Sequence, residues 1–241
     1  MGRHFKAIIL DLEEVVAQTV EQHVRAWKVA IEDFLEQGYD NDNLLEDFSE
    51  YINKNPGKET VKEFLKLKDI TLPDGNPGDS PEASTIHGLA NKENQVFLEM
   101  ISKEGVKTFS DTIRQVTRWK NRGLKAAVIS SGRNADSLIG AAGIRDLFDF
   151  VLDASEIEEL GLKPKPAPDS FYYVCEKLGA TPEECVLIED SPEGIQAGCE
   201  AGFGLVVGVA RNGSKRELLD IGADVSISDM EELRYREEES V

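Results

Sequence analysis

The chain has 241 residues, of which 40% are hydrophobic and 30% are charged, which suffices for one sizeable core and a smaller second module. Its 46 acidic side chains exceed its 27 basic ones and give a formal net charge of −19, which disfavours binding to nucleic acid and to anionic membranes. The N-terminal apolar run is too short for a membrane span and lacks a signal-peptide cleavage pattern. Three cysteines without metal-binding or disulfide spacing favour a reducing compartment, so we expect a cytoplasmic protein. The sequence does not determine the oligomeric state, and nothing in it requires more than a monomer.

The first predicted element is a strand over residues 7–11, an apolar run that ends at Asp11. A continuous apolar run of this length is typical of a strand buried on both faces of a parallel sheet. The segment from residue 17 to residue 106 departs from this pattern and is predicted to be helical. Its expected helices cover residues 19–36, 44–52, 59–68 and 92–102, with a loop over residues 72–81.

From about residue 107 onward, apolar runs alternate with segments of helical periodicity. Strands are expected at residues 126–130, 150–152, 186–188, 205–209 and 225–227, and helices at residues 111–122, 135–142, 169–178, 192–201 and 215–221. This alternation predicts right-handed βαβ units and therefore an α/β fold with a doubly wound parallel sheet. We expect residues 1–16 and 107–241 to form this core domain, with residues 17–106 inserted into it as an all-helical domain.

Acidic, hydroxyl and ammonium groups cluster where the predicted strands end. They are Asp11 and Glu13 at the first strand, Ser130 at the second, Lys165 in the loop KPKPAPDSF, and Glu189 and Asp190 at the end of VLIED. In doubly wound sheets, ligands bind outside the carboxyl ends of the strands. We therefore expect these side chains to converge in one crevice.

This combination of groups predicts phosphoryl transfer. A carboxylate can attack phosphorus and form an aspartyl phosphate, which divides one difficult displacement into two. Clustered carboxylates repel one another unless a hard divalent cation with oxygen ligands, such as Mg²⁺, lies among them. A hydroxyl, backbone amides and a lysine can hold the remaining phosphoryl oxygens.

Four segments in chain order, ILDLEEVV, AVISSGRN, KPAPDSF and VLIEDSPEGIQAGCEAGFGLVVGV, resemble the haloacid dehalogenase superfamily, in the subgroup that contains β-phosphoglucomutase and related sugar-phosphate phosphatases. Each segment alone is a weak signal, whereas all four in this order are specific. The resemblance implies a Rossmann-like catalytic core, with the helical insert as a mobile cap that excludes water. It also implies an Mg²⁺-dependent enzyme that acts on a small phosphorylated metabolite, a sugar phosphate.

The resemblance further implies a role for each residue at the strand ends. Asp11 corresponds to the nucleophile and a metal ligand. Glu13 stands where the family has an aspartate that serves as general acid and base and whose backbone carbonyl binds the metal. The other implied roles are those of Ser130 and Lys165, which hold phosphoryl oxygens, and of Glu189 and Asp190, which bind or orient Mg²⁺.

Substrate-binding residues are implied in both domains. In the helical insert, the pattern T-x-x-x-H-x-x-A-W places His23 and Trp27 on one helix face, although core packing is an alternative role for Trp27. In the core, the residues implied in substrate binding are Ser131, Gly132, Arg133 and Asn134. A surface cation is the alternative for Arg133, and an N-cap of the next helix is the alternative for Asn134.

The sequence departs from the family pattern D-x-D-G-[TV] at two positions. Glu13 keeps a carboxylate but is one methylene longer than aspartate, and Glu14 replaces a glycine, which is unfavourable if the position needs a positive φ. In the helical insert, Gly57 and Glu93 stand where related sequences carry cations that hold a second phosphate. Three functions therefore stay open: a phosphatase, which we favour, a β-phosphoglucomutase, and a catalytically impaired binding protein.

Overall fold

A computed structural model describes residues 5–36, 44–52, 57–211 and 213–233. The chain divides into two compact units, one formed by Met1–Gln18 with Val106–Val241 and the other by Thr19–Gly105. These bounds differ by one or two residues from those expected at 17 and 106. The boundary near residue 17 shifts because β2 (Ala17–Gln18) pairs antiparallel with β3 (Lys107–Thr108), which keeps both short strands in the first unit.

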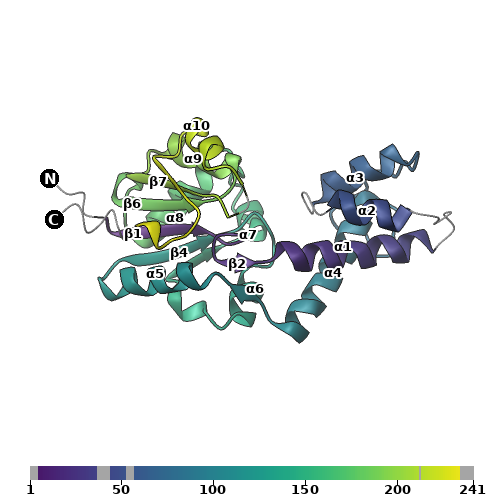
Figure 1. Ribbon diagram of the computed structural model, residues 1–241, viewed down its shortest axis with the longest axis horizontal. Helices are drawn as coiled ribbons and strands as arrows, with labels where there is room; N and C mark the ends of the chain where they lie inside the picture. The colour runs from purple at the N-terminus through teal and green to yellow at the C-terminus, as the bar shows by residue number, and fades with distance from the viewer. Residues whose placement is uncertain (1–4, 37–43, 53–56, 212, 234–241) are drawn as a thin grey trace. The chain divides into compact units, whose positions relative to one another are not determined.

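The first unit is built on a six-stranded parallel sheet in the order β5-β4-β1-β6-β7-β8. Its strands β4, β1, β6 and β7 are labelled in Figure 1. Its strands are β1 (Ala7–Asp11), β4 (Lys125–Ile129), β5 (Phe150–Leu152), β6 (Cys185–Glu189), β7 (Leu205–Val209) and β8 (Val225–Ile227). Every residue of β1 and β6 is buried, which is why these strands read as unbroken apolar runs. The predicted doubly wound α/β fold is confirmed.

The strand order brings the acidic residues that end the central strands β1 and β6 side by side. From β1 the chain proceeds to β4 and β5 on one side, and then returns to β6, β7 and β8 on the other side. The order therefore reverses at β1, and the crevice for a ligand in such sheets lies at the carboxyl ends of the strands beside this reversal. Asp11 ends β1 and Glu189 ends β6, next to it.

Helices pack around this sheet (Figure 1). They are α5 (Ser110–Asn121), α6 (Ala135–Ala141), α7 (Ala154–Glu159), α8 (Asp169–Leu178), α9 (Pro192–Ala201) and α10 (Lys215–Ile221), with short 3-10 turns at Arg145–Leu147 and Pro182–Glu184. Phe171 and Val174 of α8 pack in the same buried apolar cluster as Ile9 of β1. The sequence pattern predicts five of the six helices within one residue at each end and misses α7, which Asp153 caps by accepting hydrogen bonds from two backbone amides.

The described part of the second unit contains four helices: α1 (Val20–Leu35), α2 (Leu44–Ile52), α3 (Lys58–Leu67) and α4 (Ile86–Glu104). Apolar side chains such as Trp27, Phe48 and Phe64 form a separate core for this unit. The prediction that α4 starts at residue 92 is wrong, because Thr85 caps the helix earlier by accepting a 2.9 Å hydrogen bond from the Gly88 amide. No helix within the described ranges is long and apolar enough to cross a membrane.

Candidate active site

Asp11 and Lys165 form the centre of a buried cluster at the carboxyl end of β1. Lys165 Nζ lies 2.5 Å from Asp11 Oδ1 and also donates to Glu189 Oε1. Solvent has little access to this contact, because the side chain of Lys165 is 8% exposed and that of Glu189 is fully buried. The predicted convergence of Asp11, Lys165 and Glu189 is therefore present in the structure, with the lysine ammonium between two carboxylates.

Glu189 is fixed by the start of α9. Its Oε2 accepts a 2.9 Å hydrogen bond from Ser191 Oγ, and the same hydroxyl caps the helix by accepting from the Gly194 amide. A Cβ at position 194 would lie 2.1 Å from Glu189 Cδ, so only glycine leaves room for the carboxylate. Ser191 and Gly194 were not among the predicted site residues, although a serine followed by Pro192 is a known signal for a helix start.

The cluster carries more negative charge than Lys165 neutralises. Burial raises the pKa of Asp11 well above its ordinary value; Lys165 opposes this, while Glu189, Glu13 and Asp190 raise it further. Burial, followed by the charge of Glu189, raises the pKa of Asp190 to about 7. Burial alone would lower the pKa of Lys165, but the charges of Asp11 and Glu189 outweigh it and raise this pKa.

The donor chemistry of this cluster fits a hard divalent cation. Carboxylate oxygens are the ligands that Mg²⁺ and Ca²⁺ prefer, and a cation would relieve the repulsion that raises the pKa values of Asp11 and Asp190. As the side chains stand, the described residues contain no group of three or more His, Cys, Asp or Glu arranged to hold a metal. The Lys165 ammonium instead contacts two of the carboxylates.

Glu13 lies in the turn that follows β1 and contacts Ser130. Ser130 Oγ lies 2.9 Å and 3.0 Å from the two carboxylate oxygens of Glu13 and donates to them. Gly132 permits this approach, because a Cβ there would lie 2.9 Å from Glu13 Oε1. The hydroxyl that was predicted to hold a phosphoryl oxygen therefore donates to a carboxylate of the chain itself.

Glu14 adopts a φ of 58°, the left-handed conformation that favours glycine. A glutamate in this conformation costs roughly 1–2 kcal/mol. Its charge also contributes to the raised pKa of Asp190. The departure from glycine at this position is therefore unfavourable for both the backbone and the electrostatics of the site.

The residues that follow Ser130 have structural contacts of their own. Arg133 is more than half exposed and forms a 2.8 Å ion pair with Glu158, and Asn134 is the N-cap residue of α6. Ser131 is exposed, and the Gly132 carbonyl accepts a hydrogen bond from the Ala154 amide. The substrate-binding roles of this group stay predictions.

The predicted substrate-binding residues of the helical unit also have partners within that unit. His23 Nδ1 lies 2.8 Å from Glu93 Oε1, and the imidazole stacks on the Phe97 ring with a centroid distance of 3.9 Å. Glu93 is 6% exposed, so its carboxylate is held beside the histidine in the interior. Trp27 is 3% exposed and packs in the apolar core of this unit.

Comparisons with known proteins show the same family along most of the chain. A family model described as haloacid dehalogenase-like hydrolase matches residues 5–202. The β-phosphoglucomutase of Mycobacterium tuberculosis is 29% identical over 238 residues, which cover 95% of this chain and 91% of that protein. The fructose-1-phosphate phosphatase of Escherichia coli is 24% identical over 209 residues, which cover 86% and 97%. A crystal structure of a putative β-phosphoglucomutase from Thermotoga maritima superposes with a TM-score of 0.72 at 21% identity, over 97% of this chain and 99% of that one.

Proposed function

Because the chain belongs to the haloacid dehalogenase-like hydrolases and is an enzyme of their phosphatase and phosphomutase kind, we propose that it hydrolyses a small sugar phosphate with Mg²⁺ through an aspartyl phosphate at Asp11. The family resemblance predicted from the four ordered motifs is confirmed. The observation that carries the proposal is the buried Asp11 carboxylate, held at the sheet reversal by a lysine that is itself shared with Glu189.

In the proposed reaction, a carboxylate oxygen of Asp11 attacks phosphorus while the bond from phosphorus to the sugar oxygen breaks. The Glu13 carboxyl gives a proton to the leaving oxygen and then takes one from the water that hydrolyses the aspartyl phosphate. Inorganic phosphate leaves and the Asp11 carboxylate is restored. Lys165 and Ser130 hold phosphoryl oxygens, so the Ser130 hydroxyl has to turn from Glu13 to the substrate.

We place the metal at the excess carboxylates of the cluster. Asp11, Glu189, Asp190 and the backbone carbonyl of Glu13 would hold Mg²⁺, which when bound neutralises charge on the transferred phosphoryl group. The helical unit would act as the cap that excludes water from the reaction. A cytoplasmic location is consistent with the three cysteines, all of which are free thiols.

The His23–Glu93 pair favours hydrolysis over the mutase reaction. A mutase has to hold a bisphosphate intermediate while it reorients, which calls for a cation at the second phosphate. Glu93 places a buried carboxylate at a position where related sequences carry such a cation, and its contact with His23 keeps it there. A carboxylate repels phosphate, so a substrate with a single phosphate fits this unit better.

The Glu13–Ser130 contact favours the alternative function, a binding protein with impaired catalysis. A general acid displaced by about 1 Å can lose about 100-fold in rate, and Glu13 is longer than the aspartate of the family and bonds to Ser130 in place of a substrate. If this arrangement persists with substrate, the site would still bind phosphate but would turn over slowly.

The test is steady-state turnover of p-nitrophenyl phosphate, followed by a panel of sugar phosphates, with Mg²⁺ and with EDTA. The proposal expects turnover that requires the metal and is lost in Asp11→Asn. An absence of turnover on every compound, together with phosphate binding in calorimetry, would establish the impaired alternative. β-Glucose 1-phosphate distinguishes a phosphatase from a mutase, because a phosphatase yields inorganic phosphate and a mutase yields glucose 6-phosphate.

Glu13→Asp tests the role assigned to Glu13. The shorter side chain withdraws from Ser130, and we expect kcat to rise by up to about 100-fold if Glu13 is misplaced as a general acid. Asp136→Glu, which also changes the acid by one methylene but is exposed on α6, is the control and should leave kcat unchanged. A kcat that falls in Glu13→Asp would show that the longer side chain is the one that suits this site.

A further inference from the structure

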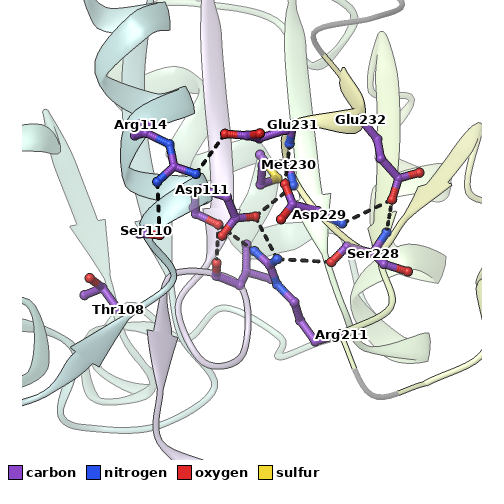
Figure 2. Close-up of polar contacts among 12 residues, drawn as sticks. Thr108, Ser110, Asp111, Arg114, Arg211, Ser228, Asp229, Met230, Glu231 and Glu232 are labelled. Atoms are coloured by element: carbon purple, nitrogen blue, oxygen red, sulfur yellow. Dashed lines mark hydrogen bonds and ion pairs between the residues drawn. The ribbon is translucent and has the colours of Figure 1, made fainter.

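A second buried polar network lies beside the turn that carries Glu13 and Glu14. Arg211, which follows β7, donates from Nη1 to Asp111 Oδ2 at 2.7 Å (Figure 2). Its Nη2 donates to Thr112 Oγ1 at 2.9 Å. The side chains of Arg211 and Asp111 are 10% and 8% exposed, and Thr112 is fully buried. Asp111 and Thr112 belong to the first turn of α5, so the guanidinium joins two segments far apart in the sequence.

The network is anchored on two further sides. Asp111 Oδ2 accepts a 2.8 Å hydrogen bond from the Met230 amide, and Arg211 Nη1 donates to the Ser228 carbonyl at 3.1 Å (Figure 2). The guanidinium carbon lies 4.2 Å from the centroid of the Phe109 ring, within the range of a cation–π contact. These contacts fix the position and orientation of the guanidinium.

The network reaches the turn after β1 through one hydroxyl. Thr112 Oγ1 donates to the Val15 carbonyl at 2.7 Å. Arginine has donors only, so the Thr112 oxygen has to accept from Arg211, and its single proton is then directed to Val15. Consecutive hydrogen bonds polarise each other, so the bond that Thr112 accepts from Arg211 strengthens the one it donates to Val15 in this buried environment. A second bond runs from the Phe109 amide to the Val16 carbonyl at 3.0 Å.

Val15 directly follows the strained residue of the turn. Glu14 has a φ of 58°, and backbone in such a conformation persists only where the surrounding structure determines it more strongly than the local preference. The turn supplies part of this restraint itself, through hydrogen bonds from the Glu14 amide to the Ala17 carbonyl and from the Val16 amide to the Leu12 carbonyl. The contacts from Thr112 and Phe109 supply the restraint from outside the turn.

We propose that Thr112 and Arg211 are positioning residues, which hold the Val15 carbonyl and thereby fix the Glu13–Glu14 turn in the geometry that presents Glu13 beside Asp11 and Ser130. Neither side chain contacts the reacting groups, and both act through the backbone of the turn. The catalytic consequence rests on the proposed function, whereas the restraint on the turn does not.

Thr112→Val is the decisive variant, because valine keeps the shape of threonine and removes the hydroxyl that joins Arg211 to Val15. Thr117→Val is the matched control, because Thr117 lies on the exposed face of the same helix and its hydroxyl donates only within it, to the Ile113 carbonyl. Thr112→Ser keeps the hydroxyl and should rescue the effects of Thr112→Val. Arg211→Lys removes the forked donor, with Arg114→Lys as its control, since Arg114 is half-exposed and pairs with Glu231 (Figure 2).

The first measurement is amide hydrogen exchange, which needs no turnover. In Thr112→Val we expect the amides of Glu14, Val16 and Ala17 to exchange at least about 10-fold faster, a factor that corresponds to the loss of one buried hydrogen bond. The amides of β1 and β6 should keep the rates of the wild type. In Thr112→Ser and Thr117→Val, the amides of the turn should exchange at the rates of the wild type.

The second measurement separates kcat from KM on the substrate that the wild type turns over. A loosened turn spreads Glu13 over more positions and lowers the fraction of time in which it can serve the leaving oxygen. We therefore expect kcat to fall by about 10-fold or more in Thr112→Val and in Arg211→Lys, with KM changed by less than about 2-fold. Unchanged exchange of the turn amides in Thr112→Val would overturn the proposal, and so would faster exchange spread evenly over the sheet, which indicates a structural role only. A wild type without turnover would refute the proposed function, while the exchange data would still decide the restraint on the turn.

Discussion

Two buried clusters of cations and carboxylates lie in the same unit, and the pKa values of their carboxyl groups are shifted in opposite directions. Around Arg211, one guanidinium meets one carboxylate, and although burial raises the pKa of Asp111, its hydrogen bonds with Arg211 and the Met230 amide outweigh burial and lower it. Around Lys165, one ammonium meets several carboxylates, and the pKa of Asp11 is raised well above its ordinary value. Both cations are almost fully enclosed.

This difference separates a cluster whose charges are balanced from one that keeps unbalanced negative charge. The Arg211 cluster balances its charge within the chain, so its ions stabilise each other and the segments that carry them. The Lys165 cluster keeps an excess of negative charge, which costs folding free energy and which only a ligand cation or proton can neutralise. Burial of ion pairs alone would not distinguish the two, whereas the direction of the carboxyl pKa does.

The sharpest difference should appear when each cluster loses one carboxylate. Asp11→Asn removes the proposed nucleophile, so we expect kcat on p-nitrophenyl phosphate to fall by at least about 10⁴-fold. The same change removes one of the excess charges, so the free energy of unfolding in EDTA should stay constant or rise. Kinetics and urea denaturation measure the two effects. An Asp11→Asn protein with activity within about 10-fold of the wild type would refute the nucleophile assignment.

The stability of the metal-free protein should depend on pH through Asp190. Its pKa is raised to about 7 in the folded state, against about 3.9 in an unfolded chain. The folded protein holds this proton more tightly, so the stabilisation is complete below about pH 4 and is lost as the pH rises through 7. Relative to Asp190→Asn, the wild type in EDTA should lose about 3 kcal/mol between pH 4 and pH 7, at about 1.4 kcal/mol for each pKa unit. Urea denaturation across this range measures it, and parallel curves for the two proteins would contradict it.

The opposite response is expected from the Arg211 cluster. Asp111→Asn leaves the guanidinium buried with its carboxylate removed, which should lower the free energy of unfolding at pH 7 by about 3 kcal/mol. Because the pKa of Asp111 is lowered in the fold, this stabilisation is present above about pH 4 and is lost as the pH falls through the folded pKa. Asp229→Asn is the control, since Asp229 is exposed and accepts from the Glu231 amide, and should change stability by less than about 0.5 kcal/mol. Equal losses of unfolding free energy in the two variants would show that the buried Asp111–Arg211 pair stabilises the fold no more than an exposed aspartate does.

The smallest effect concerns Glu14, which adds strain and charge beside the Lys165 cluster. Glu14→Gly should raise the free energy of unfolding by about 1 kcal/mol, because relief of the left-handed conformation exceeds the entropy that glycine adds to the unfolded chain. Asp69→Gly is a matched control, since Asp69 also has a φ of 58° but lies in the helical unit. Asp69→Gly should be stabilised less than Glu14→Gly, because aspartate tolerates the left-handed conformation better than glutamate, and only Glu14→Gly should raise kcat. A rise in kcat in both would point to stability as its cause.

Much of the α/β unit follows from local sequence pattern. β1, β5, β7 and β8 begin and end at the predicted residues. The reason is clearest for β1, which is buried throughout and therefore requires a continuous apolar run before Asp11. The site acids Asp11 and Glu189 could be predicted because each ends such a run. The two short strands Ala17–Gln18 and Lys107–Thr108 could not, since each has only two residues and is defined by pairing with the other.

Other features were decided by contacts between residues far apart in the chain. Lys165 reaches Asp11 across 154 positions, Ser130 reaches Glu13 across 117, and Arg211 reaches Asp111 across 100. A local pattern contains no information on which side chain meets which, because that depends on the order of the strands and on how the loops that follow them pack. The sequence alone therefore determined which strand ends carry acidic and hydroxyl side chains. Only the tertiary structure decided that Lys165 lies between two carboxylates, that Glu13 bonds to Ser130, and that Arg211 pairs with Asp111.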